Sequence, residues 1–232
     1  MRLNRYLALR GIATRRQADE LIAAGLVTLD GVVATIGTKV MSTDQEVTLA
    51  PDVKTLHQNL VYYAYHKPRG IITHSPQGKE QAIREVVGLK GVFPVGRLDK
   101  DSEGLIILTN DGRVTERLLS PRFEHEKEYI VTVREIIPPE VKERLEAGVE
   151  EGGEQLRAKQ VTILNKHTAN IILTEGKKHE IRRMLGSCHL TVTELRRVRI
   201  MGVHLGSLRP GAYRTLAGKA KENFLRDLGL IS

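Results

Sequence analysis

The sequence has very little cysteine and few aromatic residues. Its 232 residues include one cysteine, no tryptophan and only 4% aromatic residues in all. The single thiol, Cys188, excludes an internal disulfide and a zinc site built from several cysteines. The low aromatic content also argues against a broad surface for stacking nucleobases.

Long apolar runs are missing as well. The longest obvious one, Leu105–Leu108, falls far short of the ~20 residues that cross a bilayer, and the N-terminus lacks an apolar signal core. Hydrophobic residues still make up 41% of the chain, which is enough for a packed core and excludes a disordered chain. We expect a soluble, cytoplasmic protein that does not bind a membrane.

The net charge of +8 is concentrated in two regions. Five arginines precede the first acidic residue, Asp19, and residues 176–232 hold twelve Lys/Arg against four Asp/Glu. Two basic surfaces suit a polyanion such as RNA, because phosphate contacts supply affinity that does not depend on sequence. Charge alone favours the simpler interpretation, a solvated charged face.

The first 50 residues predict two short helices and a small sheet. Leu3 and Leu7 share one face of the first helix, and the spacing of Thr14 and Gln17 is typical of a capping box that opens the second. Asp30-Gly31 between valine-rich runs predicts a hairpin. We expect a compact domain at 1–50, a linker at 51–60 and a larger domain at 61–232.

The larger domain mixes strand-like and helical patterns without a regular alternation. The expected strands are Val61–Tyr65, Ile71–Thr73, Val92–Val95, Leu105–Thr109, Tyr129–Val133, Gln160–Leu164, Ile171–Thr174, Val192–Ile200 and Tyr213–Leu216. The expected helices are Glu80–Val87, Arg113–Leu119, Pro139–Ala147, His179–Gly186 and Ala217–Leu228. This order argues against a doubly wound parallel sheet and favours an α+β domain with a mixed, mainly antiparallel sheet flanked by helices.

Several common chemistries are excluded by single positions. His125-Glu126 and His179-Glu180 begin like zinc-protease helices, but Tyr129 and Arg183 stand where the second histidine is needed. In Gly176–Lys178, a lysine occupies the Ser/Thr position of a phosphate-binding loop. We expect no metal and no nucleotide cofactor.

Three segments remain as candidates for a functional site. Asp99 lies in a polar loop between two apolar strands, Tyr129 opens a strand whose Ile/Val content predicts burial on both faces, and Arg182 lies at the margin of an apolar helix face. Taken singly, each has a structural explanation: a turn residue, a packing residue, and an arginine whose stem lines the core.

In order along the chain, these segments resemble the motifs of RNA pseudouridine synthases of the small-subunit rRNA synthase A family. The catalytic motif is matched by Gly96–Leu105 with Leu108–Gly112, and later motifs by Lys127–Tyr129, Glu180–Met184 and Leu195–Ile200. The large-subunit synthase F branch is the most similar, although Lys177–Glu180 replaces the Asn/Arg/Gln-rich sequence usual there.

The N-terminal domain resembles the S4 RNA-binding domain of the same family. The matching segments are Arg2–Tyr6, Ala13–Arg16, Leu21–Val27 and Asp30-Gly31. The resemblance therefore implies an S4 domain followed by a catalytic domain with the pseudouridine synthase fold.

The resemblance also implies roles for individual residues. Asp99 is the expected catalytic carboxylate, and Arg182 is expected to pair with it and orient it. Tyr129 would stack on a flipped uracil, Leu195 would supply an apolar wall, and Arg97 would support the site. The residues expected to contact RNA are Arg2, Arg5, Arg15, Arg16, Lys177, Lys178, Arg183, Arg196 and Arg197.

The implied reaction detaches uracil from its ribose and rejoins it through carbon, without a cofactor. We expect a monomer that modifies structured RNA, foremost 23S rRNA. The alternatives are 16S rRNA, a tRNA anticodon arm, or a non-catalytic S4-type assembly factor. The sequence does not indicate which uridine is modified, because RNA recognition is spread over shape and loop contacts.

Overall fold

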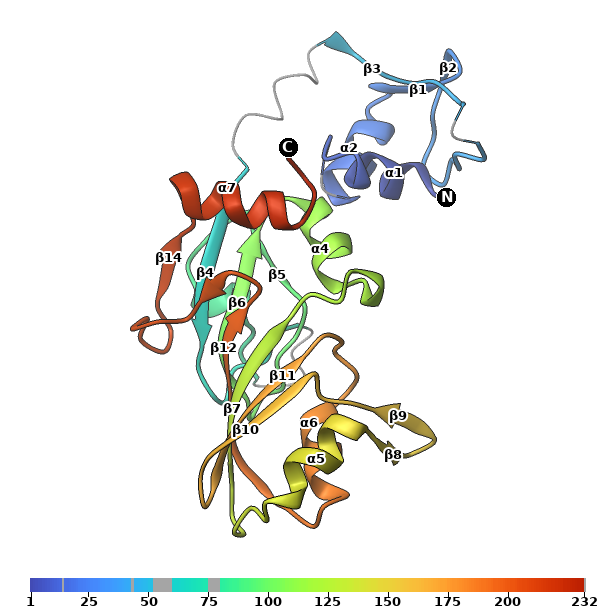
Figure 1. Ribbon diagram of the computed structural model, residues 1–232. Coiled ribbons are helices and arrows are strands. Elements are labelled where there is room, and N and C mark those ends of the chain that lie inside the picture. Colours follow the sequence, from blue (N-terminus) through green and yellow to red (C-terminus); the bar gives the residue numbers. More distant parts are fainter. Residues whose placement is uncertain (14, 43, 52–59, 75–79, 232) are drawn as a thin grey trace.

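The computed structural model describes residues 1–13, 15–42, 44–51, 60–74 and 80–231, which form a small N-terminal part and a larger part (Figure 1). In the N-terminal part, helices α1 (Leu3–Leu9) and α2 (Arg15–Ala23) pack on a three-stranded antiparallel sheet. Its strands are β1 (Val27–Leu29), β2 (Val32–Val33) and β3 (Val47–Leu49), in the order β2-β1-β3.

The N-terminal part follows the predicted pattern closely. Leu3 and Leu7 are fully buried in its core, and the β1–β2 turn consists of Asp30 and Gly31. Both turn residues have positive φ, 52° and 78°, which suits a two-residue hairpin turn. The predicted cap residue Thr14, and residues 52–59 of the predicted linker, lie outside the described residues.

The larger part is built on a nine-stranded sheet with helices packed against it. The strands are β4 (Tyr62–Lys67), β5 (Phe93–Val95), β6 (Glu103–Thr109), β7 (Lys127–Val133), β8 (Val149–Glu151), β9 (Glu154–Leu156), β10 (Gln160–Asn165), β11 (Thr168–Leu173), β12 (Val192–Ile200), β13 (Val203–His204) and β14 (Tyr213–Thr215). The helices are α3 (Ile83–Val86), α4 (Gly112–Leu119), the 3-10 turn η2 (Pro121–Phe123), α5 (Glu140–Ala147), α6 (Glu180–Gly186) and α7 (Gly218–Asp227). The main strand order is β10-β11-β7-β12-β6-β4-β14, with β13 beside β12, β5 beside β6, and β8–β9 as a separate hairpin.

The sheet has two halves that meet at a short junction. Strands β12 and β6 run parallel and pair only through Arg196 with Glu103 and Arg197 with Gly104. The other strand pairs described for this sheet are antiparallel. Across the junction, the buried Arg197 donates from Nε to the carbonyl oxygen of Leu105 at 2.7 Å.

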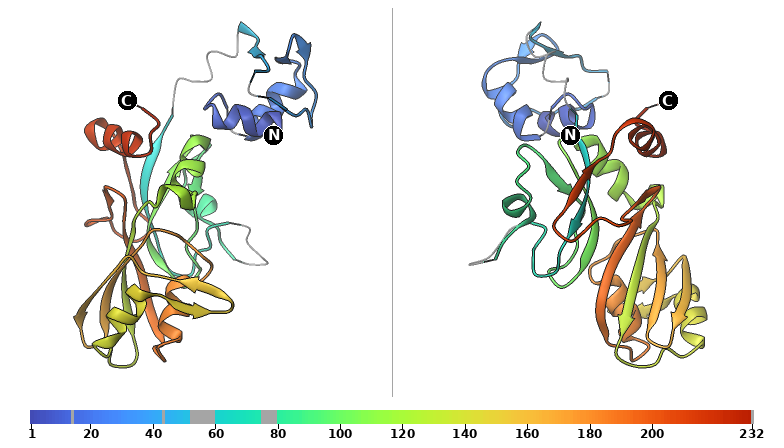
Figure 2. Two further views of the ribbon diagram at one scale, coloured as in Figure 1. Left: turned by 45° about the vertical axis from the view of Figure 1, so that its right-hand side comes forward. Right: turned by 90° about the vertical axis from the view of Figure 1, so that its left-hand side faces the viewer.

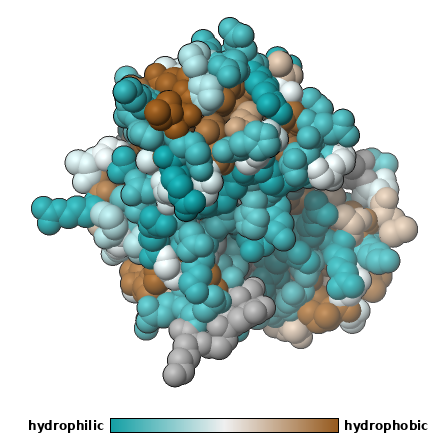
Figure 3. Space-filling view, turned by 90° about the horizontal axis from the view of Figure 1, so that it is seen from below, coloured by the Kyte–Doolittle hydropathy of each residue, from teal (hydrophilic) through white to brown (hydrophobic). Residues whose placement is uncertain are grey.

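Each half has its own hydrophobic core. Helices α5 and α6 pack on the β7–β10–β11–β12 half through Leu145, Ile181 and Met184, and α4 and α7 pack on the β4–β6 half through Leu118 and Phe224. Both views of Figure 2 place α5 and α6 at the end of the molecule away from the N-terminal part. Figure 3 views the molecule from that end and shows a largely hydrophilic surface between separate apolar patches. No described helix is both long and apolar enough to span a membrane.

The fold class agrees with the prediction, and the differences are local. The strand predicted at Ile71–Thr73 is reduced to a bridge between Ile72 and Ala82, because the Thr73 hydroxyl bonds to the backbone of Leu98. The helix predicted at 80–87 is shortened to α3. Strands β8, β9 and β13 were not predicted, and β7 alternates fully and partly buried residues instead of burying both faces.

Candidate active site

Asp99 lies in the turn between β5 and β6, and its backbone is fixed on both sides. The hydroxyl of the buried Thr73 donates to the carbonyl oxygen of Leu98 at 2.8 Å and accepts from the Leu98 N–H at 3.1 Å. The Ser102 N–H donates to the Asp99 carbonyl oxygen at 3.1 Å. The Asp99 side chain keeps 41% of its surface exposed. The turn therefore presents a carboxylate to solvent from a rigid backbone.

Lys67, which sequence reasoning missed, lies buried beneath this turn. Its Nζ donates to the carbonyl oxygens of Ser102 at 2.7 Å, Pro68 at 3.0 Å and Lys100 at 3.5 Å. Burial lowers the pKa of Lys67 to about 8, although the carboxylates of Asp99 and its neighbours act in the opposite direction. A buried ammonium thus holds the backbone that directly follows Asp99 to the end of β4.

An apolar wall adjoins the Asp99 turn. The side chains of Leu98, Tyr129 and Leu195 are buried in one cluster, to which β7 contributes Tyr129 and β12 contributes Leu195. The guanidinium carbon of Arg197 lies 6.0 Å from the centre of the Tyr129 ring. The structure therefore places the predicted Tyr129 and Leu195 in the same hydrophobic core as Leu98, the residue that precedes Asp99.

The predicted ion pair between Asp99 and Arg182 is absent from the described residues. The Asp99 carboxylate instead lies 3.4 Å from Nε2 of His179, which immediately precedes α6. Arg182 donates from one terminal nitrogen, Nη1, to the carbonyl oxygen of Val192 at 3.3 Å, and its buried Nη2 has no hydrogen-bond partner. Arg182 lies on the predicted helix, and its partner in this structure is backbone rather than a carboxylate.

A buried acid, Glu180, holds the loop that carries His179. Its carboxylate accepts the Lys177 N–H at 2.9 Å, and its other oxygen is buried without a partner. Burial raises the pKa of Glu180 to about 7; the hydrogen bond from the Lys177 N–H acts in the opposite direction, and the nearby Glu175 adds to the increase. Burial also lowers the pKa of Lys127 to about 8, although the charge of Glu180 acts in the opposite direction.

The raised pKa of Glu180 predicts a stability gain for Glu180→Gln. The folded protein binds this proton more tightly than the unfolded chain, so the Glu180 contribution to the free energy of unfolding falls as pH rises from about 4.5 to about 7. Glutamine can still accept the Lys177 N–H. We expect the variant to gain roughly 1–3 kcal/mol at pH 8 and nothing at pH 4.

Urea unfolding of Glu180→Gln at pH 4, 6 and 8 measures this effect. The exposed Glu140 gives a matched control, and Glu140→Gln should leave the pH profile unchanged. A Glu180→Gln variant that is destabilised at pH 8 would show that the charged form of Glu180 is the stabilising one.

The residues predicted to contact RNA divide into exposed and engaged side chains. Arg2, Arg5, Arg15, Arg16, Lys178 and Arg196 are exposed, and Arg16 is paired with Glu20 at 3.5 Å. Arg97, predicted to support the active site, is also exposed. Three further residues of this set bind protein groups in this structure.

These three residues are Arg197, Lys177 and Arg183. Arg197 is only 5% exposed and bonds across the sheet junction, so phosphate contact does not fit it. Lys177 donates to the carbonyl of Gln155 at 2.6 Å, and Arg183 pairs with Glu154 at 2.5 Å. Gln155 and Glu154 both belong to the β8–β9 hairpin, which was not predicted. These two cations fasten α6 and its preceding loop to that hairpin.

The site as a whole combines a partly exposed carboxylate with a hydrophobic core that holds both its neighbour Leu98 and the buried Tyr129. A carboxylate in such a place can attack an electrophile or accept a proton, and the wall offers a surface for a planar ring. Among the described residues, no three metal-ligating side chains cluster here or elsewhere.

Known proteins resemble this chain over almost its whole length. The RNA pseudouridylate synthase family profile matches residues 61–187, and the S4 domain profile matches residues 1–45. The dual-specificity RNA pseudouridine synthase RluF of Escherichia coli (strain K12) is 38% identical over 218 residues, covering 93% of this chain and 75% of that protein. An uncharacterised RNA pseudouridine synthase of Mycobacterium leprae is 35% identical over 242 residues, covering 99% of this chain and 94% of that protein.

A solved structure agrees with the sequence relatives. A crystal structure of pseudouridylate synthase matches with a TM-score of 0.70 and 26% identity, covering 98% of this chain and 99% of that one. The match takes in both the N-terminal part and the sheet with its junction. On these grounds the chain belongs to the RNA pseudouridine synthase family, with an S4 domain at its N-terminus.

Proposed function

We propose that this enzyme isomerises uridine in structured 23S rRNA, with Asp99 as the carboxylate that engages the target nucleotide. The observation that carries the proposal is the rigid turn that presents Asp99, whose chain neighbour Leu98 belongs to the same hydrophobic core as Tyr129 and Leu195. A substrate in ribosomal RNA implies that the enzyme works in the cytoplasm.

The isomerisation needs few functional groups beyond those of these residues. The bond between N1 and C1′ breaks, a bond between C5 and C1′ forms, C5 loses a proton, and N1 gains one. No electrons enter or leave, so a carboxylate and positioned polar groups are sufficient. Tyr129 and the apolar wall would hold the detached base, and the unpartnered Nη2 of Arg182 is free to bind Asp99 or the nucleotide.

The target uridine must also leave its stack, at a cost of a few kcal/mol. The exposed arginines of the S4 domain, Arg2, Arg5 and Arg15, would offset this cost through phosphate contacts. The name of the relative RluF, "dual-specificity", favours testing 16S rRNA and tRNA anticodon arms as well. A purely non-catalytic assembly role does not fit a chain with this synthase domain.

Pseudouridine mapping of total RNA from cells that lack the protein tests the target. We expect at least one pseudouridine of 23S rRNA to disappear and to return on complementation. Loss of a site only in 16S rRNA or tRNA would reassign the substrate, and an unchanged map would overturn the proposal.

The buried Lys67 is expected to act as a positioning residue for Asp99. Lys67→Met removes two hydrogen bonds to carbonyls of the Asp99 segment, those of Lys100 and Ser102. A displacement of about 1 Å at a reacting group can lower a rate by about 100-fold. We therefore expect single-turnover pseudouridine formation to fall by about 10- to 100-fold while RNA affinity changes little.

A pH profile separates positioning from general destabilisation. Because the pKa of Lys67 is lowered to about 8, the wild-type rate should decline above about pH 8 as the ammonium loses a proton. That decline should be missing in Lys67→Met. The exposed Lys142 gives a control, since Lys142→Met should keep both the rate and the profile.

A further inference from the structure

Two arginines surround one phenylalanine on the face between the S4 domain and the active site. The guanidinium carbon of Arg122 lies 4.6 Å from the centre of the Phe123 ring, and that of Arg117 lies 5.1 Å from it. His125 is stacked on the same ring, with centres 5.7 Å apart and planes inclined by 20°. We call Arg117, Arg122, Phe123 and His125 the arginine–phenylalanine cluster.

The two guanidiniums of this cluster form no ion pair with a carboxylate among the described residues. Burial and the nearby Lys127 lower the pKa of His125, so its ring is neutral at neutral pH and adds no charge of its own. Two unpaired guanidiniums beside one ring form a focus of positive potential that suits a polyanion.

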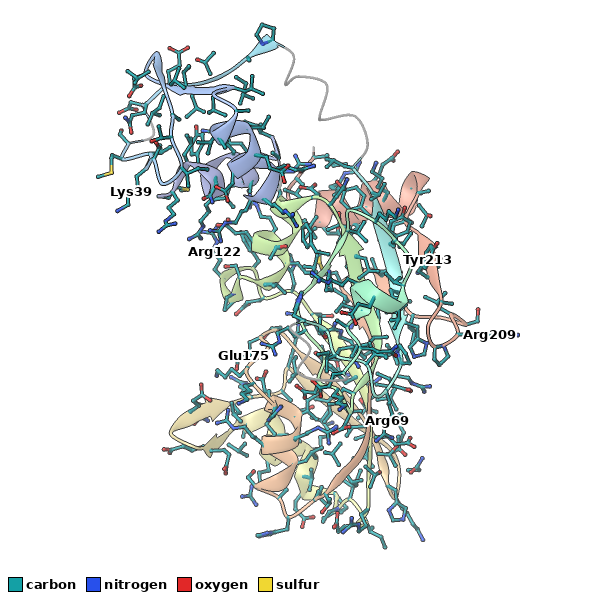
Figure 4. All side chains as sticks on the ribbon, turned by 180° about the vertical axis from the view of Figure 1, so that it is seen from behind. Lys39, Arg69, Arg122, Glu175, Arg209 and Tyr213 are labelled. Carbon is teal, nitrogen blue, oxygen red and sulfur yellow. The ribbon has the colours of Figure 1, made fainter. Side chains whose placement is uncertain are left out.

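The cluster lies where an RNA bound by both domains would pass. It is formed by the end of α4, η2 and the start of the segment leading to β7, and α4 contacts α1 of the S4 domain, where Ala8 lies beside Gly112. Figure 4 shows Lys39 of the S4 domain, Arg122, and Glu175, which precedes the His179 loop, along one side of the molecule. Arg209 and Tyr213 lie on the opposite side in the same view.

The geometry points to a stacking site: we propose that Arg122, backed by Phe123, stacks on an unpaired nucleobase of the substrate RNA. A guanidinium has two flat faces, and the Arg122 guanidinium lies over the Phe123 ring. The Arg122 side chain is exposed, so the second face is open to a base. Unpaired bases of RNA commonly stack on arginine planes, and a lysine has no plane to offer.

This site would provide one local surface for stacking a nucleobase, in a protein whose low aromatic content argues against a broad one. A base held there, between the S4 domain and the Asp99 turn, would help keep the RNA open next to the uridine that leaves its stack. The inference rests on the proposed function only in taking RNA as the substrate. It does not depend on the role of Asp99.

Stacking and phosphate contact predict different responses to substitution. The probe is a fluorescein-labelled 12-nucleotide single-stranded RNA of mixed sequence, compared with its duplex. We expect Arg122→Ala to weaken binding of the single strand by about 5- to 100-fold, the range for one stacked base. Arg122→Lys should fail to restore it, and the plot of log affinity against log salt should keep its slope.

The control is Arg209→Ala, which removes an equally exposed arginine from the opposite side. A lysine variant that restores affinity, together with a salt slope reduced by about 1 in Arg122→Ala, would show a phosphate contact and overturn the stacking proposal. Arg122→Ala binding like Arg209→Ala would also overturn it. Phe123→Leu, which leaves both arginines in place, should reproduce part of the loss, and thermal unfolding checks that each variant is folded.

Activity separates this proposal from the proposed function. If wild-type enzyme forms pseudouridine in 23S rRNA and Arg122→Ala does so with unchanged KM, the stacking site is wrong and the enzyme function stands. If wild-type enzyme modifies no RNA but Arg122→Ala still loses single-strand affinity, the stacking site stands and the proposed function fails.

Discussion

Asp99→Asn is expected to abolish pseudouridine formation, a fall of about 10⁴-fold or more, while RNA affinity stays nearly unchanged. Asparagine keeps the volume of the side chain and much of its hydrogen bonding, but it carries no negative charge and is neither a nucleophile nor a proton acceptor. The backbone of the turn does not depend on the carboxylate. It is held by the Thr73 hydroxyl, which bonds to the main chain of Leu98, and by the Ser102 N–H, which donates to the Asp99 carbonyl oxygen. The loss should therefore appear in the chemical step alone.

A neighbouring residue supplies the control for this prediction. Asp101 is exposed in the same turn and contributes to the same local charge around Lys67. Asp101→Asn should keep pseudouridine formation within a few-fold of wild type. The measurement is single-turnover pseudouridine formation in rRNA with the enzyme in excess, beside direct RNA binding. Turnover by Asp99→Asn close to that of Asp101→Asn would remove Asp99 from the reaction.

The parts of the site that were predicted from sequence are those set by local pattern. Apolar runs on both sides of a polar loop predicted the turn that carries Asp99, and helical spacing predicted the helix that carries Arg182. The N-terminal hairpin followed from Asp30-Gly31. Each of these depends on residues a few positions apart, which is the range over which propensity and periodicity act.

The parts that were missed depend on contacts distant in the sequence. The buried Nζ of Lys67 donates a hydrogen bond to a carbonyl about 35 residues further along the chain. A lysine at the end of a predicted strand gives no indication of such a contact. The β8–β9 hairpin has few apolar residues, and Arg183 and Lys177 hold it through ionic and polar contacts. Charge alone did not indicate these contacts, because a basic residue can bind a protein carboxylate as well as a phosphate.

Arg197 is different, because the sequence did contain the signal. In a strand, side chains alternate between the two faces, so Arg197 shares the face of Leu195 and not that of Arg196. The observed burial follows this alternation: Leu195 and Arg197 are buried and Arg196 is exposed. Strand alternation is thus a better guide than charge for sorting arginines within a predicted strand.

Gly104→Ala is expected to destabilise the protein by about 3–5 kcal/mol or to prevent folding. Gly104 has a φ of +112°, where a residue with a Cβ is strained by about 1–3 kcal/mol. A Cβ at this position would also lie 2.3 Å from the Arg197 carbonyl oxygen and 2.6 Å from its nitrogen. These are backbone atoms of the facing strand, so relief requires the two half-sheets to move apart, which adds about 1–3 kcal/mol.

The effect should be specific to the junction, and Gly211→Ala isolates it. Gly211 has a φ of +82°, and a Cβ there would meet nothing within 4 Å, so this variant carries the backbone strain without the collision. The free energies of unfolding in urea should differ by about 1–3 kcal/mol between the two variants, the contribution of close approach at the junction.

Because Arg196 and Arg197 alone pair β12 with β6, separating the strands there also shifts Tyr129 and Leu195 relative to Asp99. Gly104→Ala that does fold should therefore lose pseudouridine formation, whereas equal stability and activity in the two variants would show that the half-sheets are held together elsewhere.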